Sequence, residues 1–167
     1  MANIEIRERS SNDADEFCRF LTKLDNEAEY MLFEKGERIV SCEITKRNIE
    51  NVIKNKDACF IALDGNCIVG FIIAVKEKYI RTNHVANIVI GVFEDYCSKG
   101  IGYELFRYVF KWAEKTCVKR MELTVITENI RAINLYKKLG FKTEGLREKS
   151  TLKNGKYYDE YYMAKIL

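Results

Sequence analysis

One stretch, residues 86–105, constrains the fold more than any other part of the chain. Its first part is rich in β-branched and other apolar residues up to Val92, which predicts a buried strand. A short polar turn at 94–99 follows, and Gly100 and Gly102 then open an amphipathic helix. A strand, a glycine-containing turn and a helix start in this order predict an α/β protein with a ligand-binding turn.

The chemistry of such a turn favours an anion. The first backbone N–H groups of a helix have no partner within the helix, and they carry the positive end of its dipole. Phosphate binds there readily, and Gly100 and Gly102 have no Cβ to keep it away. The dinucleotide fingerprint is excluded because Leu105 stands where a third glycine is needed. The Walker pattern is excluded because Lys99 precedes Gly100 instead of following it.

Two motifs carry a resemblance to a known family. The hexapeptide Cys97-Ser98-Lys99-Gly100-Ile101-Gly102 resembles the acyl-CoA-binding motif Arg/Gln-x-x-Gly-x-Gly/Ala of the GNAT superfamily of N-acetyltransferases, with Cys97 as the departure. The segment 129–141, Asn-Ile-Arg-Ala-Ile-Asn-Leu-Tyr-Lys-Lys-Leu-Gly-Phe, matches the family's Asn-x-x-Ala-x-x-Leu-Tyr-x-x-x-Gly-Phe. Both motifs occur in the family's order, and the resemblance extends from about Asn83 to the C-terminus.

The resemblance implies a single domain over residues 1–167 with an α/β fold. We expect a mixed, mostly antiparallel central sheet of about seven strands, splayed between strands 4 and 5, with helices on both faces. Turn signals at Asp64-Gly65-Asn66 and Asn154-Gly155 predict two hairpins. Gly91 interrupts the apolar alternation of its strand, which predicts a bulge that separates this strand from its neighbour.

Composition narrows the function. Hydrophobic residues make up 47% of the 167 residues and charged residues 32%, which is typical of a soluble globular protein. A net charge of +3 is too small to indicate nucleic acid or membrane as a partner. Six cysteines without C-x-x-C spacing and one histidine predict no metal. The N-terminus has no signal-peptide layout, so we expect a cytoplasmic protein, and a homodimer stays open.

The resemblance also implies acetyl-CoA as co-substrate and direct acetyl transfer to a primary amine. Backbone groups of the strand end are expected to pair with the pantetheine arm as an added strand would. The turn and first helical residues are expected to hold the pyrophosphate, and Asn129 the CoA arm. Tyr136 occupies the family position of the acid that protonates the CoA thiolate; a structural tyrosine is the alternative. The expected binding residues are Ile90, Gly91, Val92, Cys97, Ser98, Lys99, Gly100, Ile101, Gly102, Tyr103 and Asn129.

Two questions stay open at this stage. The general base is Glu122, His84 or a water relay. The acceptor is a polyamine, an amino acid, an amino sugar or another small amine, or else a protein N-terminus of the ribosomal-protein-alanine type. Some relatives that acetylate protein N-termini carry a Glu five residues before Asn129; Thr124 stands there, which favours a small amine. A non-catalytic CoA-binding module is the alternative of another class.

Overall fold

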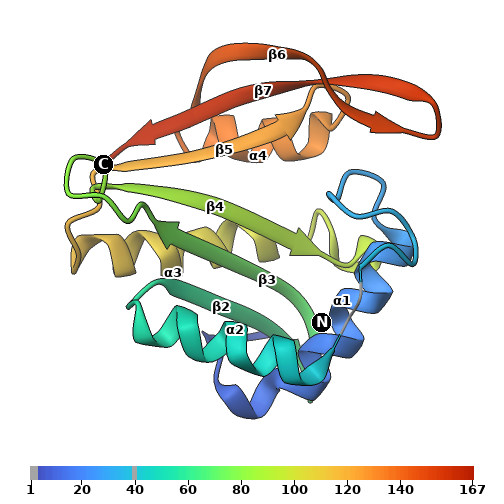
Figure 1. The fold of residues 1–167 in the computed structure, drawn as a ribbon, viewed down its shortest axis with the longest axis vertical. Helices are drawn as coiled ribbons and strands as arrows, with labels where there is room; N and C mark the ends of the chain where they lie inside the picture. Colours follow the sequence, from blue (N-terminus) through green and yellow to red (C-terminus); the bar gives the residue numbers. More distant parts are fainter. Residues whose placement is uncertain (1–3, 39–40) are drawn as a thin grey trace. The chain divides into compact units, whose positions relative to one another are not determined.

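The computed structural model describes residues 4–38 and 41–167. The first residues, on which the expectation of no leader peptide partly depends, lie outside this range. Strands and helices are interspersed along these residues (Figure 1). In order they are β1 (Ile4–Glu8), the short 3-10 helix η1 (Ser11–Asp13), α1 (Ala14–Glu27), α2 (Cys42–Lys54), β2 (Ala58–Asp64), β3 (Cys67–Lys76), β4 (Val85–Val92), η2 (Glu94–Tyr96), α3 (Ile101–Glu114), β5 (Arg120–Ile126), α4 (Ile130–Lys138), β6 (Lys142–Lys153) and β7 (Lys156–Ile166).

The strands form one sheet of seven, in the order β1-β2-β3-β4-β5-β7-β6. The pair β4–β5 is parallel, whereas β1–β2, β2–β3, β5–β7 and β6–β7 are antiparallel. The predicted α/β class with a mixed, mostly antiparallel sheet is therefore confirmed. The chain forms two compact units. The first unit consists of the residues up to Val75 together with Val89–Lys115, and the second consists of Lys76–Ile88 and Thr116–Leu167. That residues 1–167 form one domain stays a prediction.

The pairing between β4 and β5 is short. Only Val85, Ala86 and Asn87 of β4 have register partners in β5, and these partners are Arg120, Met121 and Glu122. Both strands continue beyond this pairing, β4 to Val92 and β5 to Ile126. The predicted splay between strands 4 and 5 is confirmed. Backbone groups past such a divergence must find partners other than the neighbouring strand.

In the first unit, helices cover both faces of the sheet. Phe71 of β3 lies edge-on against Phe17 and Phe20 of α1, with ring centroids 5.4 and 5.7 Å away. Phe60 of β2 lies 5.4 Å from Tyr108 of α3. Phe60 pairs with Ile72, the neighbour of Phe71, so Phe60 and Phe71 point to opposite faces. The predicted layering is thereby confirmed for this unit.

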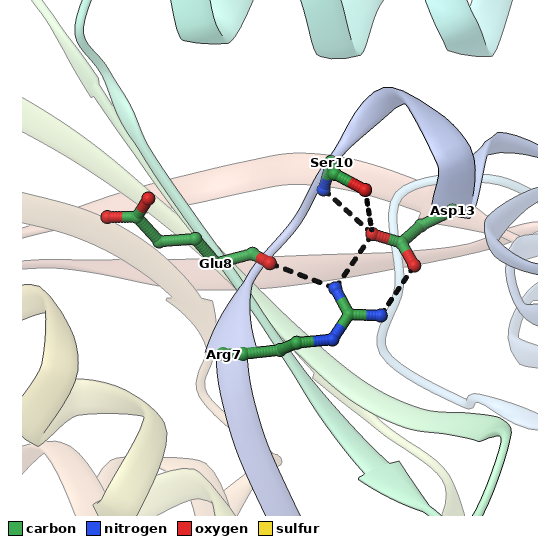
Figure 2. A network of polar contacts seen from close by, with 4 residues as sticks. All are labelled: Arg7, Glu8, Ser10 and Asp13. Carbon is green, nitrogen blue, oxygen red and sulfur yellow. Dashed lines mark hydrogen bonds and ion pairs between the residues drawn. The ribbon is translucent and has the colours of Figure 1, made fainter.

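A carboxylate fixes the passage from β1 into α1 (Figure 2). Arg7 donates two hydrogen bonds to Asp13, of 2.9 and 2.7 Å. The backbone N–H and the hydroxyl of Ser10 donate to Oδ2 of the same carboxylate, at 2.7 and 3.0 Å. The hydrogen bond from Arg7, followed by those from Ser10, lowers the pKa of Asp13 to about 2. The carboxylate is therefore charged wherever the protein is folded near neutral pH.

The second unit contains a capped helix and the hairpin turn that the sequence predicts at Asn154-Gly155. Asn129 caps α4, because its Oδ1 accepts from the backbone N–H of Ala132 at 3.2 Å. Gly140, with a φ of +91°, ends that helix. Asn154 and Gly155 have φ angles of +50° and +77°, as a type I′ hairpin turn requires, and join β6 to β7. Strand β7 then lies beside β5.

Candidate active site

The turn between β4 and α3 is built from tight local contacts. The Phe93 ring lies 4.7 Å from that of Phe20 in α1, which anchors the start of the turn in the core. Ser98 and Gly100 both adopt left-handed backbone, with φ angles of +59° and +85°. Gly100 is the N-cap of α3, and a side chain would strain the backbone at this φ. This is the position at which the sequence motif has its first glycine.

Two long-range hydrogen bonds hold the turn from outside. The backbone N–H of Glu94 donates to Oε1 of Glu27, at the end of α1, at 3.0 Å. The hydroxyl of Tyr96 donates to Oδ2 of Asp64, in the β2–β3 hairpin, at 2.7 Å. This bond to a carboxylate raises the pKa of Tyr96, so the hydroxyl keeps its proton. Neither contact has a local sequence signal, since both join distant segments.

The N-terminus of α3 is arranged to receive an anion. Ile101 is buried and fixes the first turn in the core, while Gly100 lies at the surface. The first helical hydrogen bond runs from the N–H of Glu104 to the carbonyl of Gly100, so the N–H groups of Ile101 and Gly102 have no acceptor within the helix. A Cβ on Gly100 would meet nothing within 4 Å, so space is open in front of the turn. These groups form the positive end of a helix dipole.

The end of β4 runs straight into this turn. Gly91 lies inside β4, next to its end, and the predicted bulge there stays a prediction. Its Cβ would lie 2.7 Å from Cδ2 of Leu24 and 2.8 Å from Cε1 of Phe71, so packing excludes a side chain. Ile90 and Val92 on either side are partly exposed. The Cys97 thiol lies 3.7 Å from the carbonyl of Val92, which ties the turn back to the strand.

The remaining predicted binding residues of this stretch lie at the surface of the turn. Ser98 and Lys99 are exposed, and the Tyr103 side chain is 39% exposed. The ammonium of Lys99 lies 5.1 Å from the ring centroid of Tyr96, within cation–π range. The first unit therefore brings together Ile90, Gly91, Val92, Cys97, Ser98, Lys99, Gly100, Ile101, Gly102 and Tyr103.

The second unit carries Asn129 and Tyr136, both from the other sequence motif. Asn129 acts as the cap of α4. Tyr136 is only 7% exposed, and its ring lies 6.0 Å from that of Phe141. Burial raises the pKa of Tyr136 well above its usual range, so the phenol is neutral over the whole physiological range. A neutral phenol is a proton donor, the form that a general acid needs.

Two side chains were considered as the general base. Glu122 forms an ion pair with Arg120, which also binds Glu144. The carboxylate of Glu122 is thus engaged with a cation. His84 is exposed, and its backbone carbonyl accepts from the N–H groups of Lys119 and Arg120 at 2.8 and 3.1 Å. These contacts do not single out either residue, and the identity of the base stays open.

Over residues 4–38 and 41–167, no group of His, Cys, Asp and Glu side chains is arranged to hold a metal ion. Within the same residues, no helix combines the length and the apolar character needed to cross a membrane.

The fold and the N-terminus of α3 together define an α/β protein with an anion-binding turn. Residues 19–141 match the model of the Acetyltransferase (GNAT) family, so the chain belongs to this family. It is therefore an N-acetyltransferase with acetyl-CoA as the donor. The L-amino acid N-acetyltransferase AaaT of Escherichia coli (strain K12) is 37% identical over 115 residues, which make up 68% of this chain and 68% of AaaT.

Solved structures agree with this assignment. An acetyltransferase of the GNAT family from Streptococcus pneumoniae has a TM-score of 0.94 and 26% identity, and the match covers 99% of this chain and 100% of that one. A phosphinothricin acetyltransferase from Sinorhizobium meliloti, solved in complex with acetyl-CoA, has a TM-score of 0.86 and 18% identity, covering 100% and 89% of the two chains. The second likeness shows the fold alone.

Proposed function

We propose that the protein transfers the acetyl group of acetyl-CoA directly to the primary amine of a small molecule, with L-amino acids as the first acceptor class to test. The proposed site for acetyl-CoA is supported by the N-terminus of α3. Gly100 has left-handed backbone there, a Cβ on Gly100 would meet nothing within 4 Å, and the first N–H groups have no acceptor within the helix. The acceptor class is supported by the 37% identity to AaaT, which is named for L-amino acids.

The donor is held mainly by the backbone. The N–H groups of Ile101 and Gly102 bind the pyrophosphate, which the helix dipole and the nearby charge of Lys99 also attract. The backbone at Ile90, Gly91 and Val92 pairs with the amides of the pantetheine arm, as an added strand would. Since these contacts use main-chain atoms, they are compatible with the packing role of the side chains.

Three chemical demands follow for the reaction. The neutral amine must lie against the thioester carbonyl carbon. The oxygen that gains negative charge must meet a hydrogen-bond donor, for which a backbone N–H near the end of β4 is the candidate. The leaving thiolate must receive a proton, which Tyr136 supplies in this proposal, because its buried phenol carries a proton at neutral pH.

The experiment is a thiol-release assay with acetyl-CoA and a panel of acceptors. The panel contains L-amino acids, a polyamine, an amino sugar and a peptide with an N-terminal alanine. Faster release with L-amino acids than with any other member supports the proposal. Selective turnover of the peptide would favour the protein N-terminal alternative, for which Thr124 stands in place of the usual Glu. Thermal protection by acetyl-CoA with no turnover would indicate a binding module without catalysis.

Gly102→Glu tests the donor site within the same assay. The substitution brings bulk and negative charge to the first turn of α3, where we expect the pyrophosphate. Acetyl-CoA should then no longer raise the melting temperature. Thr143→Glu serves as the charge-matched control, because it also adds one negative charge and Thr143 is an exposed residue of β6 outside the proposed site. Undiminished protection of the Gly102 variant would place the donor elsewhere.

A further inference from the structure

A pocket of about 230 Å³ lies in the first unit, away from the anion-binding N-terminus of α3 at Gly100–Gly102. It is bounded by the end of β1, helix α2, the start of β2 and the last turn of α3. Ile49 and Cys59 form its buried apolar part, and Val52, Ile53 and Trp112 form its walls. Four charged residues also line it: Arg9 is buried, whereas Glu8, Lys56 and Asp57 are at least partly exposed. The pocket is smaller than sites for drug-sized ligands, roughly 300–1,000 Å³, so its occupant is small.

Arg9 has an unusual environment for a cation. The residue is only 6% exposed, and its guanidinium carbon lies 4.3 Å from the ring centroid of Phe17. Its Nε is buried without a hydrogen-bond acceptor, and no carboxylate among the described residues forms an ion pair with it. Desolvation by burial lowers the pKa of Arg9. A buried charge without a partner is costly, and native proteins normally supply one.

The nearby acid does not serve as that partner. The charge of Asp13 acts on Arg9 at a distance, but its carboxylate oxygens are engaged by Arg7 and Ser10 (Figure 2). The contact with the Phe17 ring satisfies one face of the guanidinium, whereas its N–H donors need oxygen acceptors. Among the described residues the Nε of Arg9 has no acceptor, and the same residue lines the pocket.

We propose that this pocket is a second ligand site, which binds a small organic carboxylate with an apolar body. The carboxylate accepts hydrogen bonds from Arg9, whose planar donors match its two oxygens. The apolar body packs against Ile49, Val52, Ile53 and the ring of Trp112. Inorganic phosphate has the charge but lacks the apolar body, and so it binds more weakly.

The second site is separate from the proposed acetyl-CoA site at the N-terminus of α3. Trp112 follows Gly102 by ten positions in the same helix, which corresponds to about 15 Å along the helix axis. The pocket and the proposed acetyl-CoA site therefore lie at opposite ends of α3, and both can be occupied at the same time. The inference does not depend on the identity of the acetyl acceptor.

Trp112 makes the proposal directly testable, because it is the only tryptophan of the chain. Its indole N–H donates to the carbonyl of Lys56 at 3.3 Å, which holds the ring at the pocket. We would titrate the full-length protein with 3-methylbutanoate and record the tryptophan fluorescence. The neutral amide of the same acid and inorganic phosphate serve as comparison probes. We expect a saturable change with the carboxylate and at least tenfold weaker binding of the other two, about 1.4 kcal/mol or more.

Variants identify the residue responsible. Arg9→Met should weaken carboxylate binding about tenfold or more, because the charged donor is lost while the volume is largely kept. The control is Arg19→Met, which removes the same charge from a side chain that is 71% exposed and outside the pocket. Val52→Phe fills the pocket without changing its charge and should also abolish binding. This second variant keeps the test valid if Arg9→Met fails to fold.

Several results would overturn the proposal. One is no saturable fluorescence change up to about 50 mM carboxylate, where even a site with a Kd near 1 mM is filled. Equal binding of the amide or of phosphate would contradict the assigned chemistry. Binding that survives in both Arg9→Met and Val52→Phe would place the ligand outside this pocket. The readout does not involve acetyl transfer, so it stays interpretable if the proposed enzymatic function fails.

Discussion

Gly91→Ala is the substitution whose effect the structure predicts most directly. A Cβ at this position would lie 2.7 Å from Leu24 and 2.8 Å from Phe71, whereas ordinary contacts begin at 3.4 Å. Both neighbours would have to retreat by more than half an ångström. Leu24 is 1% exposed and Phe71 3% exposed, and the Phe71 ring also packs edge-on against Phe17 and Phe20. Little free space is available for this movement.

The expected cost combines two opposing terms. Overpacking of a dense core costs roughly 1–3 kcal/mol. Replacing glycine by alanine restricts the unfolded chain and returns about 0.4–1 kcal/mol. The free energy of unfolding should therefore fall by about 1–2 kcal/mol. At roughly 2–4 °C for each kcal/mol in a chain of this size, the melting temperature should drop by about 2–8 °C.

The assay is urea unfolding followed by circular dichroism, with the slope of the transition checked for constancy. Gly145→Ala is the matched control, because a Cβ there meets nothing within 4 Å and the backbone is not left-handed. It should be neutral or slightly stabilising. Gly70→Ala, with its nearest contact at 3.2 Å from Val92, should fall between the two.

Two results would refute this reasoning. If Gly91→Ala unfolds at the urea concentration of the original protein, Leu24 and Phe71 are not as closely packed as the contacts indicate. If Gly145→Ala loses as much stability, the cost is a general property of glycine in these strands. A shifted strand end should also raise the KM for acetyl-CoA, since the proposed pantetheine contacts use the backbone of Gly91.

Three further predictions concern single side chains. Asp25 accepts hydrogen bonds from Arg38 at 2.6 and 3.1 Å, and its side chain is only 4% exposed. Arg38→Gln should therefore lower the free energy of urea unfolding by roughly 2–3 kcal/mol, because the buried carboxylate loses its partner. Adding Asp25→Asn to this variant should recover part of the loss. The lowered pKa of Asp13 adds stability that is complete above about pH 4 and lost as the pH falls to about 2. In Asp13→Asn, the free energy of unfolding should therefore fall by about 1–2 kcal/mol less between pH 4 and pH 2 than in the original protein, after allowance for the exposed Arg7. Tyr136→Phe should lower kcat about 100-fold in the thiol-release assay and leave the Kd for acetyl-CoA unchanged, and an unchanged kcat would exclude the acid role.

Local signals predict the parts of this protein that local physics determines. The β4–turn–α3 unit follows from an apolar run and two glycines, because the strand propensity of β-branched residues and the left-handed helix cap are local properties. Asn129 and the turn at Asn154 and Gly155 are similar cases, in which side-chain capping or backbone conformation is decided within four residues. The motifs that indicate the family consist largely of such positions.

Contacts between distant segments could not be predicted in this way. The glycine at position 91 indicates a bulge when its strand is considered alone, but the sequence gives no sign that Leu24 and Phe71 leave no room for a side chain there. The hydroxyl of Tyr96 donates to Asp64, which lies 32 residues earlier in the sequence, and no sequence pattern links the two residues. Tyr136 is placed on α4 by its spacing from the cap, but its near-complete burial depends on the core around it.

Arg7 and Arg9 show how far apart two similar residues can be in their physical state. They stand two positions apart, so alternation along a strand would place both on one face as solvated cations. Strand β1 ends at Glu8, although the N–H of Arg9 still donates to the carbonyl of Cys59 in β2 at 3.0 Å. Arg7 remains partly exposed and binds Asp13, whereas Arg9 turns inward against Phe17 with its Nε unsatisfied. Because the Asp13 carboxylate is engaged by Arg7 and Ser10, it leaves the Nε of Arg9 without an acceptor, and this arginine lines the pocket proposed above for a carboxylate.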